Sequence, residues 1–336
     1  MAHLLISKRH FLATGLASLL PMPVFAAPAI VTVPIRIYRD RAAVIPVTLN
    51  GQGPFPFALA TGSPLNVIDY DLATELSLAP VNQIKNFFLQ SRTVSLGSEN
   101  KEIDVTCPSV KIGDCDLKTR VFDTQRLKPE DEAEHLRHRS RADYPRGVMG
   151  TNMFVETCCL IDFAAGQLSF YPEGGLDVSG FTTLDAKIGD TDLAHDKSIT
   201  VPAKLDGETL TCYIDSSGNT ELYLTSKYVK SHDLFGRFTD FTDVPHDVKD
   251  PSKGSARVVR MRNFQFGGMS FDEINVTLGD PRHSDRLGEA GVKAVIGRKL
   301  LAQGSLAFRD NAVYIKPNAM FTPFSPAYVL PDMSDD

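Results

Sequence analysis

The feature that most constrains the fold of this chain is an internal repeat, in which two segments follow the same order of strand, turn and glycine. The segment 45–51 alternates apolar and other residues and ends in Asn50-Gly51, and the segment 199–207 does the same and ends in Asp206-Gly207. Alternation with a period of two is typical of half-buried strands, and Asn-Gly or Asp-Gly is typical of a tight hairpin turn. We therefore expect each copy to open with a β-hairpin.

In each copy the second strand leads into a loop of small residues. Apolar residues alternate over 55–59 in the first copy and over 210–214 in the second. The next residue is Ala60 in one copy and Asp215 in the other, an offset of 215 − 60 = 155 residues. The loops continue as Thr61-Gly62-Ser63 and Ser216-Ser217-Gly218. Short helices are expected to begin near Asp71 and Ser226, at the same offset.

Three later landmarks keep the same order. They pair Val110–Gly113 with Phe264–Gly267, Gly147–Gly150 with Ala294–Gly297, and Leu168–Pro172 with Val313–Pro317. The offsets shrink from 267 − 113 = 154 to 317 − 172 = 145. A charge-rich insertion at Lys128–Arg146 in the first copy accounts for the shrinkage, and such a run is usually a solvated face. Alternating strands resemble one another in any β protein. That general likeness explains the alternation but not why the glycines of the two copies follow the same order.

The repeat also sets the domain organisation that we predict. A chain of 336 residues with 43% hydrophobic residues is long and apolar enough for two domains with buried cores. We predict an N-terminal lobe at 30–172, a linker at 173–197 rich in Gly, Asp and Thr, a C-terminal lobe at 198–318, and a tail at 319–336. The predicted class is all-β.

Residues 1–26 have the layout of a secretory signal peptide. Lys8-Arg9-His10 forms a charged region, Phe11–Leu20 is apolar but too short to span a bilayer, and Val24–Ala27 offers small residues for cleavage. Ser7–Leu12 also resembles a twin-arginine signal in which Lys8 replaces the first arginine. No later segment is apolar for long enough to cross a membrane. We therefore expect a periplasmic or secreted protein.

Composition argues against several classes of function. The net charge is −6 and no basic stripe is present, so nucleic acid is not an expected partner. The five cysteines lack zinc-site spacing, and no metal or cofactor is expected. Cys107 and Cys115 form the one local disulfide candidate, although small buried side chains are the better interpretation of most cysteines. No Gly-x-Ser-x-Gly elbow is present.

The landmarks together resemble the aspartic-protease superfamily, especially its retropepsin-like members. Asn50–Ser63 follows the strand-and-turn pattern that leads to Asp-Thr-Gly-Ser in that family, and Val148-Met149-Gly150 and Val295-Ile296-Gly297 match its apolar-apolar-Gly signature. The resemblance covers residues 40–318. It implies two pseudo-symmetric β-barrel-like lobes, a cleft between them that binds a peptide or protein, and a flap, which we place at Arg92–Lys101.

The resemblance also exposes a missing carboxylate. Catalysis in this family needs two carboxylates that share a proton, and Ala60 stands where the first is expected. Asp215 aligns with the second. Thr61 and Ser216 match the hydroxyl residues that brace the two loops, and Ser217 replaces a glycine, which would permit positive φ and close backbone approach. The predicted cleft-floor residues are Thr61, Gly62, Ser63, Ser216, Ser217 and Gly218.

Three hypotheses follow for function. The leading one is an aspartic-protease-like protein that has lost most or all peptidase activity and binds peptides. The second is an active peptidase in which Asp215 works with an unrecognised partner, or a sequence in which Ala60 was introduced by engineering. The third is an envelope scaffold that binds a folded protein. Asp69 and Asp71 lie beyond the loop and are not expected to reach the cleft floor.

Overall fold

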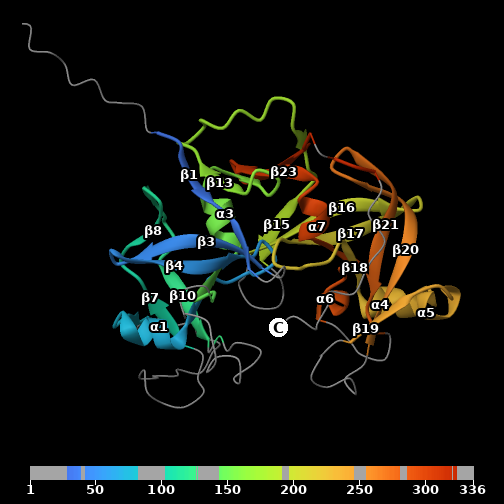
Figure 1. The fold of residues 1–336 in the computed structure, drawn as a ribbon, viewed down its shortest axis with the longest axis horizontal. Helices are drawn as coiled ribbons and strands as arrows, with labels where there is room; N and C mark the ends of the chain where they lie inside the picture. Colours follow the sequence, from blue (N-terminus) through green and yellow to red (C-terminus); the bar gives the residue numbers. More distant parts are fainter. Residues whose placement is uncertain are drawn as a thin grey trace, which may run out of the picture.

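The computed structural model describes residues 29–38, 42–81, 103–125, 127, 144–190, 197–245, 255–280, 286–319 and 321–323. Over these residues the chain is mainly β, with three sheets and a few short helices (Figure 1). The all-β prediction is confirmed. The predicted signal peptide, the flap at 92–101 and most of the insertion at 128–146 lie outside the described residues.

The N-terminal lobe is built on a 10-stranded sheet. Its strands are β2 (Arg36–Tyr38), β3 (Ala42–Leu49), β4 (Gln52–Leu59), β5 (Val67–Asp69), β6 (Ala79–Pro80), β7 (Asp104–Thr106), β8 (Val110–Ile112), β9 (Cys115–Asp116), β10 (Val121–Gln125) and β11 (Gly147–Met149). The spatial order is β6-β7-β10-β5-β11-β4-β3-β8-β9, with β2 paired to β3. The predicted strands at 45–49 and 55–59 are thus confirmed as β3 and β4.

The C-terminal lobe is built on an 8-stranded sheet. Its strands, in spatial order, are β15 (Lys187–Asp190), β16 (Lys197–Leu205), β17 (Glu208–Asp215), β22 (Ala294–Gly297), β18 (Leu222–Leu224), β21 (Met269–Leu278), β20 (Ser255–Phe266) and β19 (Thr242–Pro245). Figure 1 shows the two lobes side by side, the N-terminal one in blue to green and the C-terminal one in yellow to orange.

A third, 6-stranded sheet joins the lobes. It contains, in spatial order, β1 (Val31–Pro34), β13 (Gln167–Phe170), β12 (Cys159–Asp162), β23 (Gly304–Arg309), β24 (Ala312–Pro317) and β14 (Thr182–Thr183). The central pairing, β12 with β23, connects the last hairpin of one copy to the last hairpin of the other. The range predicted as a linker carries β14 of this sheet and β15 of the C-terminal sheet.

The strand pairings repeat between the lobes. The strand before each loop pairs in parallel with the strand of the apolar-apolar-Gly signature, β4 with β11 and β17 with β22. The strand after each loop pairs antiparallel with that same strand, β5 with β11 and β18 with β22. It also pairs in parallel with a further strand, β10 or β21. The predicted pseudo-symmetry of the lobes is therefore present in their hydrogen-bonding pattern.

The hairpin turns agree with the sequence pattern. Asn50 and Gly51 both have positive φ, 49° and 77°, and Asp206 and Gly207 have 48° and 85°. Two successive residues with positive φ are typical of a type I′ turn, which matches the twist of the flanking strands. Because Asn, Asp and Gly tolerate this conformation best, the dipeptides fix both hairpins at equivalent places.

Short helices follow the strands in both lobes. They are α1 (Tyr70–Glu75), α3 (Thr151–Glu156), α4 (Ser226–Ser231), α5 (Leu234–Arg237), α6 (Arg286–Glu289) and α7 (Arg298–Leu301). The starts of α1 and α4 confirm the helices predicted near Asp71 and Ser226. Over the described part of the chain, none of the helices has the length and apolar character needed to cross a membrane.

One continuous apolar core runs through both lobes and the joining sheet. The aromatic rings of Phe154 on α3 and Phe308 on β23, whose centroids are 5.1 Å apart, link the N-terminal lobe to that sheet. All five cysteines are unpaired, so the Cys107–Cys115 disulfide does not form. Burial raises the pKa of Cys159 and of Cys212 to about 12, as expected for small buried thiols.

Candidate functional site

The two predicted loops meet where β4 and β17 end. Four hydrogen bonds, all at 3.0–3.1 Å, join them. The Thr61 hydroxyl donates to the Ile214 carbonyl, and the Ser216 hydroxyl donates to the Leu59 carbonyl. Each hydroxyl oxygen also accepts a hydrogen bond from the backbone N–H of the opposite residue, Ser216 or Thr61. We call this set of four bonds the clasp.

The clasp is symmetric under exchange of the two loops. Thr61 exchanges with Ser216 and Leu59 exchanges with Ile214, at the same offset of 155 residues that the sequence repeat has. Both clasp side chains are 0% exposed, so water does not compete for these bonds. Since Ala60 follows Leu59 and Asp215 follows Ile214, residues 60 and 215 occupy equivalent positions in the two loops.

Two glycines support the loops from below. Gly150, directly after β11, and Gly297, the last residue of β22, end the two apolar-apolar-Gly signatures. A Cβ on Gly150 would lie 2.2 Å from the Leu65 carbonyl oxygen, and one on Gly297 would lie 2.3 Å from the Thr220 carbonyl oxygen. Leu65 and Thr220 are again 155 residues apart. Each signature therefore ends in glycine because the loop backbone leaves no room for a side chain.

The Asp215 carboxyl group is held by its own loop. Its Oδ1 accepts hydrogen bonds from the Ser217 N–H at 2.9 Å and from the Ser217 hydroxyl at 2.6 Å. No hydrogen bond or ion pair reaches Oδ2 from the residues that the structure describes. The side chain is half-buried, and it packs so closely on Gly62 that a Cβ there would lie 2.6 Å from Asp215 Cγ. Tyr213, which the sequence reasoning missed, donates its hydroxyl to the Gly62 carbonyl at 3.1 Å.

These contacts test what the sequence predicted for glycine in the loops. Close approach is required at Gly62, because Asp215 rests on it. Neither Gly62 nor Ser217 has a positive φ, so the serine enters the second loop without backbone strain. Gly218 beyond it has room, since a Cβ there would lie 3.6 Å from Asp215 Oδ2.

Ala60 is buried and carries no polar side-chain atom. It is 3% exposed, and its backbone N–H donates to the Met149 carbonyl at 3.0 Å. Ser63, three residues on, turns its hydroxyl to the Leu65 carbonyl at 2.8 Å, within its own loop. The two loops therefore bring together one carboxyl group, two buried hydroxyls used by the clasp, and a methyl group at the position equivalent to the carboxyl.

Other candidate residues do not join this site. Asp69 ends β5 and caps α1, where its Oδ1 accepts from the N–H groups of Asp71 and Leu72, and burial raises its pKa. His232 stacks on Tyr228, with ring centroids 4.0 Å apart, in the C-terminal lobe. Over the described residues, no group of three or more His, Cys, Asp or Glu side chains could hold a metal ion.

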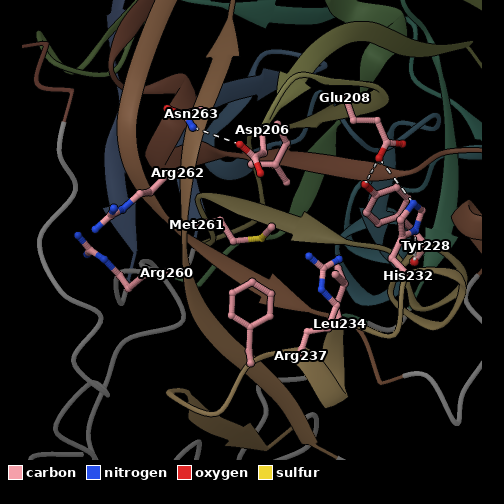
Figure 2. A pocket seen from close by; sticks show the side chains of 12 residues that line it. Asp206, Glu208, Tyr228, His232, Leu234, Arg237, Arg260, Met261, Arg262 and Asn263 are labelled. Atoms are coloured by element: carbon pink, nitrogen blue, oxygen red, sulfur yellow. Dashed lines mark hydrogen bonds and ion pairs between the residues drawn. The ribbon is translucent and has the colours of Figure 1, made fainter.

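A separate hollow of about 350 Å³ lies in the C-terminal lobe, away from the loops (Figure 2). It lies between the β16–β17 turn, the α4–α5 pair and β20. The lining residues are Leu205, Asp206, Glu208, Tyr228, His232, Leu234, Arg237, Phe238, Arg260, Met261, Arg262 and Asn263. No sequence motif predicted it, because its walls come from three segments that are distant in the chain.

Comparison with known proteins adds a fold likeness only. No protein family matches the chain, and no curated protein matches it in sequence. A solved structure, the crystal structure of aspartic proteinase from Irpex lacteus, aligns with a TM-score of 0.49 and 12% identity, over 88% of this chain and 99% of that one. At these values the likeness assigns neither an activity nor a substrate to the chain.

Proposed function

We propose that this chain is an exported, aspartic-protease-like protein that has lost peptide hydrolysis through the absence of one catalytic carboxylate, and that it binds peptides between its lobes. The observation that carries the proposal is the symmetric clasp, which makes Ala60 the counterpart of Asp215. The resemblance to aspartic proteases in the loop motifs points the same way. The repeated pairing pattern supports an origin of the two lobes by internal duplication.

The chemistry explains why one carboxyl group is not enough. Hydrolysis by a pair of carboxyls requires one member to take a proton from water while the other donates to the substrate carbonyl. The methyl of Ala60 can do neither. A well-placed acid or base contributes roughly 10²–10⁴ in rate, and members of a coupled set lose more than that when one is removed.

Peptide binding depends less on the second carboxylate than peptide hydrolysis does. The clasp, the supporting glycines and the Asp215 loop are all in place without a second carboxylate. A peptide backbone offers N–H donors, and Asp215 Oδ2 is an acceptor with no partner from the described residues. We therefore infer that a peptide lies across the loops with an N–H group near this oxygen.

Export is the remaining part of the proposal. It rests on the charged and apolar segments of residues 1–26, which are outside the described residues, and stays a prediction. Fractionation of cells that express the full chain, with N-terminal sequencing of the product, checks it. A mature protein beginning near Ala27 outside the cytoplasm is the expected result, and an intact cytoplasmic chain would contradict it.

The central experiment separates turnover from binding. Cleavage of a fluorogenic peptide library is measured from pH 3 to pH 7 with the natural chain and with Asp215→Asn, and peptide binding is measured in parallel by fluorescence polarisation. We expect equal, background turnover in both proteins and peptide binding that Asp215→Asn changes. Turnover by the natural chain that Asp215→Asn abolishes would establish an active peptidase instead. Capture of a folded protein without any peptide affinity would establish a scaffold.

A further inference from the structure

The hollow in the C-terminal lobe combines apolar walls with an unpartnered cation. Leu205 and Leu234 on its lining are almost fully buried, 3% and 4% exposed, and Phe238 and Met261 are partly buried against the core. Figure 2 shows Met261 reaching from β20 into the space between the turn and the helices. A small apolar group placed here would be removed from water on several sides.

The acidic residues on the lining are already satisfied. Asp206 accepts a hydrogen bond from the side-chain amide of Asn263 at 3.2 Å. Glu208 accepts from the Tyr228 hydroxyl at 2.8 Å and lies 3.6 Å from His232 Nε2 (Figure 2), and it also accepts from the Lys293 ammonium at 2.9 Å. These carboxylates therefore do not need a cationic ligand, and the hollow is unsuited to an ammonium or a metal ion.

The arginines are not equally satisfied. Arg260 pairs with Glu273 on β21. Arg262 has no side-chain acceptor among the described residues, but side chains alternate along a strand, and both arginines project from β20 to the side opposite Met261, away from the hollow (Figure 2). Arg237, at the end of α5, has no side-chain acceptor among the residues that the structure describes. Its guanidinium lies next to Leu234 and across the hollow from Asp206, in Figure 2. Of the lining arginines, it is the one that lacks a described acceptor and also faces the hollow.

We propose that this hollow is a second ligand site, which binds an organic carboxylate with a compact apolar body. The guanidinium of Arg237 would take the carboxylate, since its fork of N–H donors matches the two oxygens. The apolar body would rest on Met261 and Leu234. A volume of about 350 Å³ is at the lower end of the range for small-molecule sites, which fits a body the size of an indole ring.

A carboxylate is favoured over a phosphate by the charge available. A phosphate brings about two negative charges and is usually held by several arginines, lysines or backbone N–H groups. Arg237 is the single arginine whose guanidinium faces the hollow, and it lies beside the apolar side chains of Leu234 and Met261 (Figure 2). The same ligand chemistry has two sources, the free C-terminus of a peptide that ends in an apolar residue and a free fatty or aromatic acid.

The absence of tryptophan from the chain makes the test direct, because any tryptophan fluorescence comes from the probe. N-acetyltryptophan carries an indole body and a carboxylate, while N-acetyltryptophanamide carries the same body without the charge. Both are titrated with the full chain at low salt. We expect saturable binding of the acid and at least tenfold weaker binding of the amide, since a charge-assisted hydrogen bond is worth about tenfold or more in affinity.

Two variants locate the site. Arg237→Gln removes an exposed, unpartnered side chain, so folding is unaffected, and it should weaken the acid about tenfold, to the level of the amide. Lys230→Gln is the matched control: Lys230 is an exposed cation on the neighbouring α4 that does not line the hollow, and its loss should leave binding unchanged. Met261→Glu, which adds a negative charge inside the hollow, should abolish binding of the acid.

Competition identifies the source. A short peptide with a free C-terminal leucine, its amidated twin and octanoate are each added to the complex with N-acetyltryptophan. Displacement by the free peptide and not by its amide indicates a peptide C-terminus, and displacement by octanoate at lower concentration indicates a free acid. Equal binding of N-acetyltryptophan and its amide, no saturable binding of either, or an unchanged affinity in Arg237→Gln would overturn the proposal.

Discussion

The loops after β4 and after β17 are held by the same four hydrogen bonds but present different chemistry. Thr61 and Ser216 exchange roles without loss, and Gly150 and Gly297 support both loops in the same way. Beside the clasp residues, the loops differ at three equivalent positions: Ala60 and Asp215, Gly62 and Ser217, and Ser63 and Gly218. Two of these differences concern the carboxyl group: Ala60 has a methyl group where the second loop has Asp215, and Ser217 has a hydroxyl group where the first loop has Gly62.

The structural role of the two loops is therefore separable from the chemistry of their side chains. The clasp does not use the side chain of residue 60, since its four bonds involve only Thr61, Ser216 and the carbonyls of Leu59 and Ile214. The Ser217 hydroxyl is a second donor to Asp215 Oδ1, beside the Ser217 N–H. The two loops therefore present one carboxylate, whose Oδ1 accepts two hydrogen bonds from Ser217, and a methyl group at the equivalent position.

The largest effect is expected when the residues at positions 60 and 217 are both changed to those of the aspartic-protease loop motif. Ala60→Asp supplies the second carboxyl group, and Ser217→Gly removes the hydroxyl while leaving the backbone N–H that also donates to Asp215. We expect peptide turnover at acidic pH to rise by about 10²-fold or more in Ala60→Asp/Ser217→Gly, and by less in Ala60→Asp alone. The rate constant kcat should account for the difference between the two variants, with KM unchanged.

Control variants distinguish an effect on the carboxyl groups from an effect on the stability of the fold. Ser217→Gly alone should show no turnover, and all three variants should have melting temperatures near that of the natural chain. Equal kcat in Ala60→Asp and in the double variant would mean that the Ser217 hydroxyl has no effect on turnover. Turnover in Ser217→Gly alone would contradict the proposal that Ala60 prevents peptide hydrolysis.

The next effect tests whether the supports beneath the loops are equivalent. Gly150→Ala and Gly297→Ala each place a methyl group within 2.2–2.3 Å of a backbone oxygen, which cannot turn aside. We expect each to lower the free energy of unfolding by about 3 kcal/mol. Gly189→Ala is the control, since a Cβ there meets nothing within 4 Å. Denaturant titration measures all three, and a large effect at only one of the two supports would break the symmetry.

A smaller effect is expected from the clasp itself. Thr61→Val and Ser216→Ala each remove a buried hydroxyl, so that one carbonyl and one N–H of the opposite loop lose a partner. Each should cost about 2 kcal/mol of unfolding free energy. Thr74→Val, which removes an exposed hydroxyl bonded to the Tyr70 carbonyl, should cost well under half of that. Equal losses of unfolding free energy at Thr61, Ser216 and Thr74 would mean that the clasp stabilises the fold no more than an exposed hydrogen bond does.

The smallest effect concerns how the free energy of unfolding depends on pH in the acidic range, through an ion pair of the C-terminal lobe. The hydrogen bond from Lys293 lowers the pKa of Glu208 below its ordinary 4.5. A lowered folded-state pKa stabilises the fold above the unfolded-state pKa, and this contribution is lost as pH falls through the folded value. Because both side chains are about two-fifths exposed, solvent screening limits it to a few tenths of a kcal/mol.

Lys293→Met should therefore reduce stability slightly at pH 6 and not at all at pH 3. Thermal melts of the two proteins across this range measure the difference. A difference in melting temperature that grows toward pH 3 would have the wrong sign and would contradict the assignment.

Much of the fold could be predicted from the sequence because local signals and repeat order agree. Asn50-Gly51 and Asp206-Gly207 fix two hairpins through their preference for positive φ, and the alternation before them fixes the strands. The equivalence of positions 60 and 215 followed from the same register. These features depend on residues that are close in sequence, so a pattern suffices to find them.

The rest depends on contacts that no local pattern encodes. The pairing of β12 with β23 joins residues almost 150 positions apart, and the strands β14 and β15 occupy a range whose composition indicated a linker. The Ser217 hydroxyl bond to Asp215 and the Tyr213 bond to Gly62 depend on how the loops fold and pack, which no sequence pattern indicates. The hollow around Arg237 likewise exists only once the turn, helices and strand are packed together.

The most direct test of the central claim is a carboxyl titration by NMR of Ala60→Asp/Ser217→Gly, with side-chain carboxyl carbons labelled in aspartate. If positions 60 and 215 face each other across the clasp, the two carboxyl groups interact and release their protons in two steps separated by more than about one pH unit. Asp215→Asn added to this variant should collapse them to one step. Two independent titrations in the same pH range, unaffected by Asp215→Asn, would show that the two positions are not counterparts.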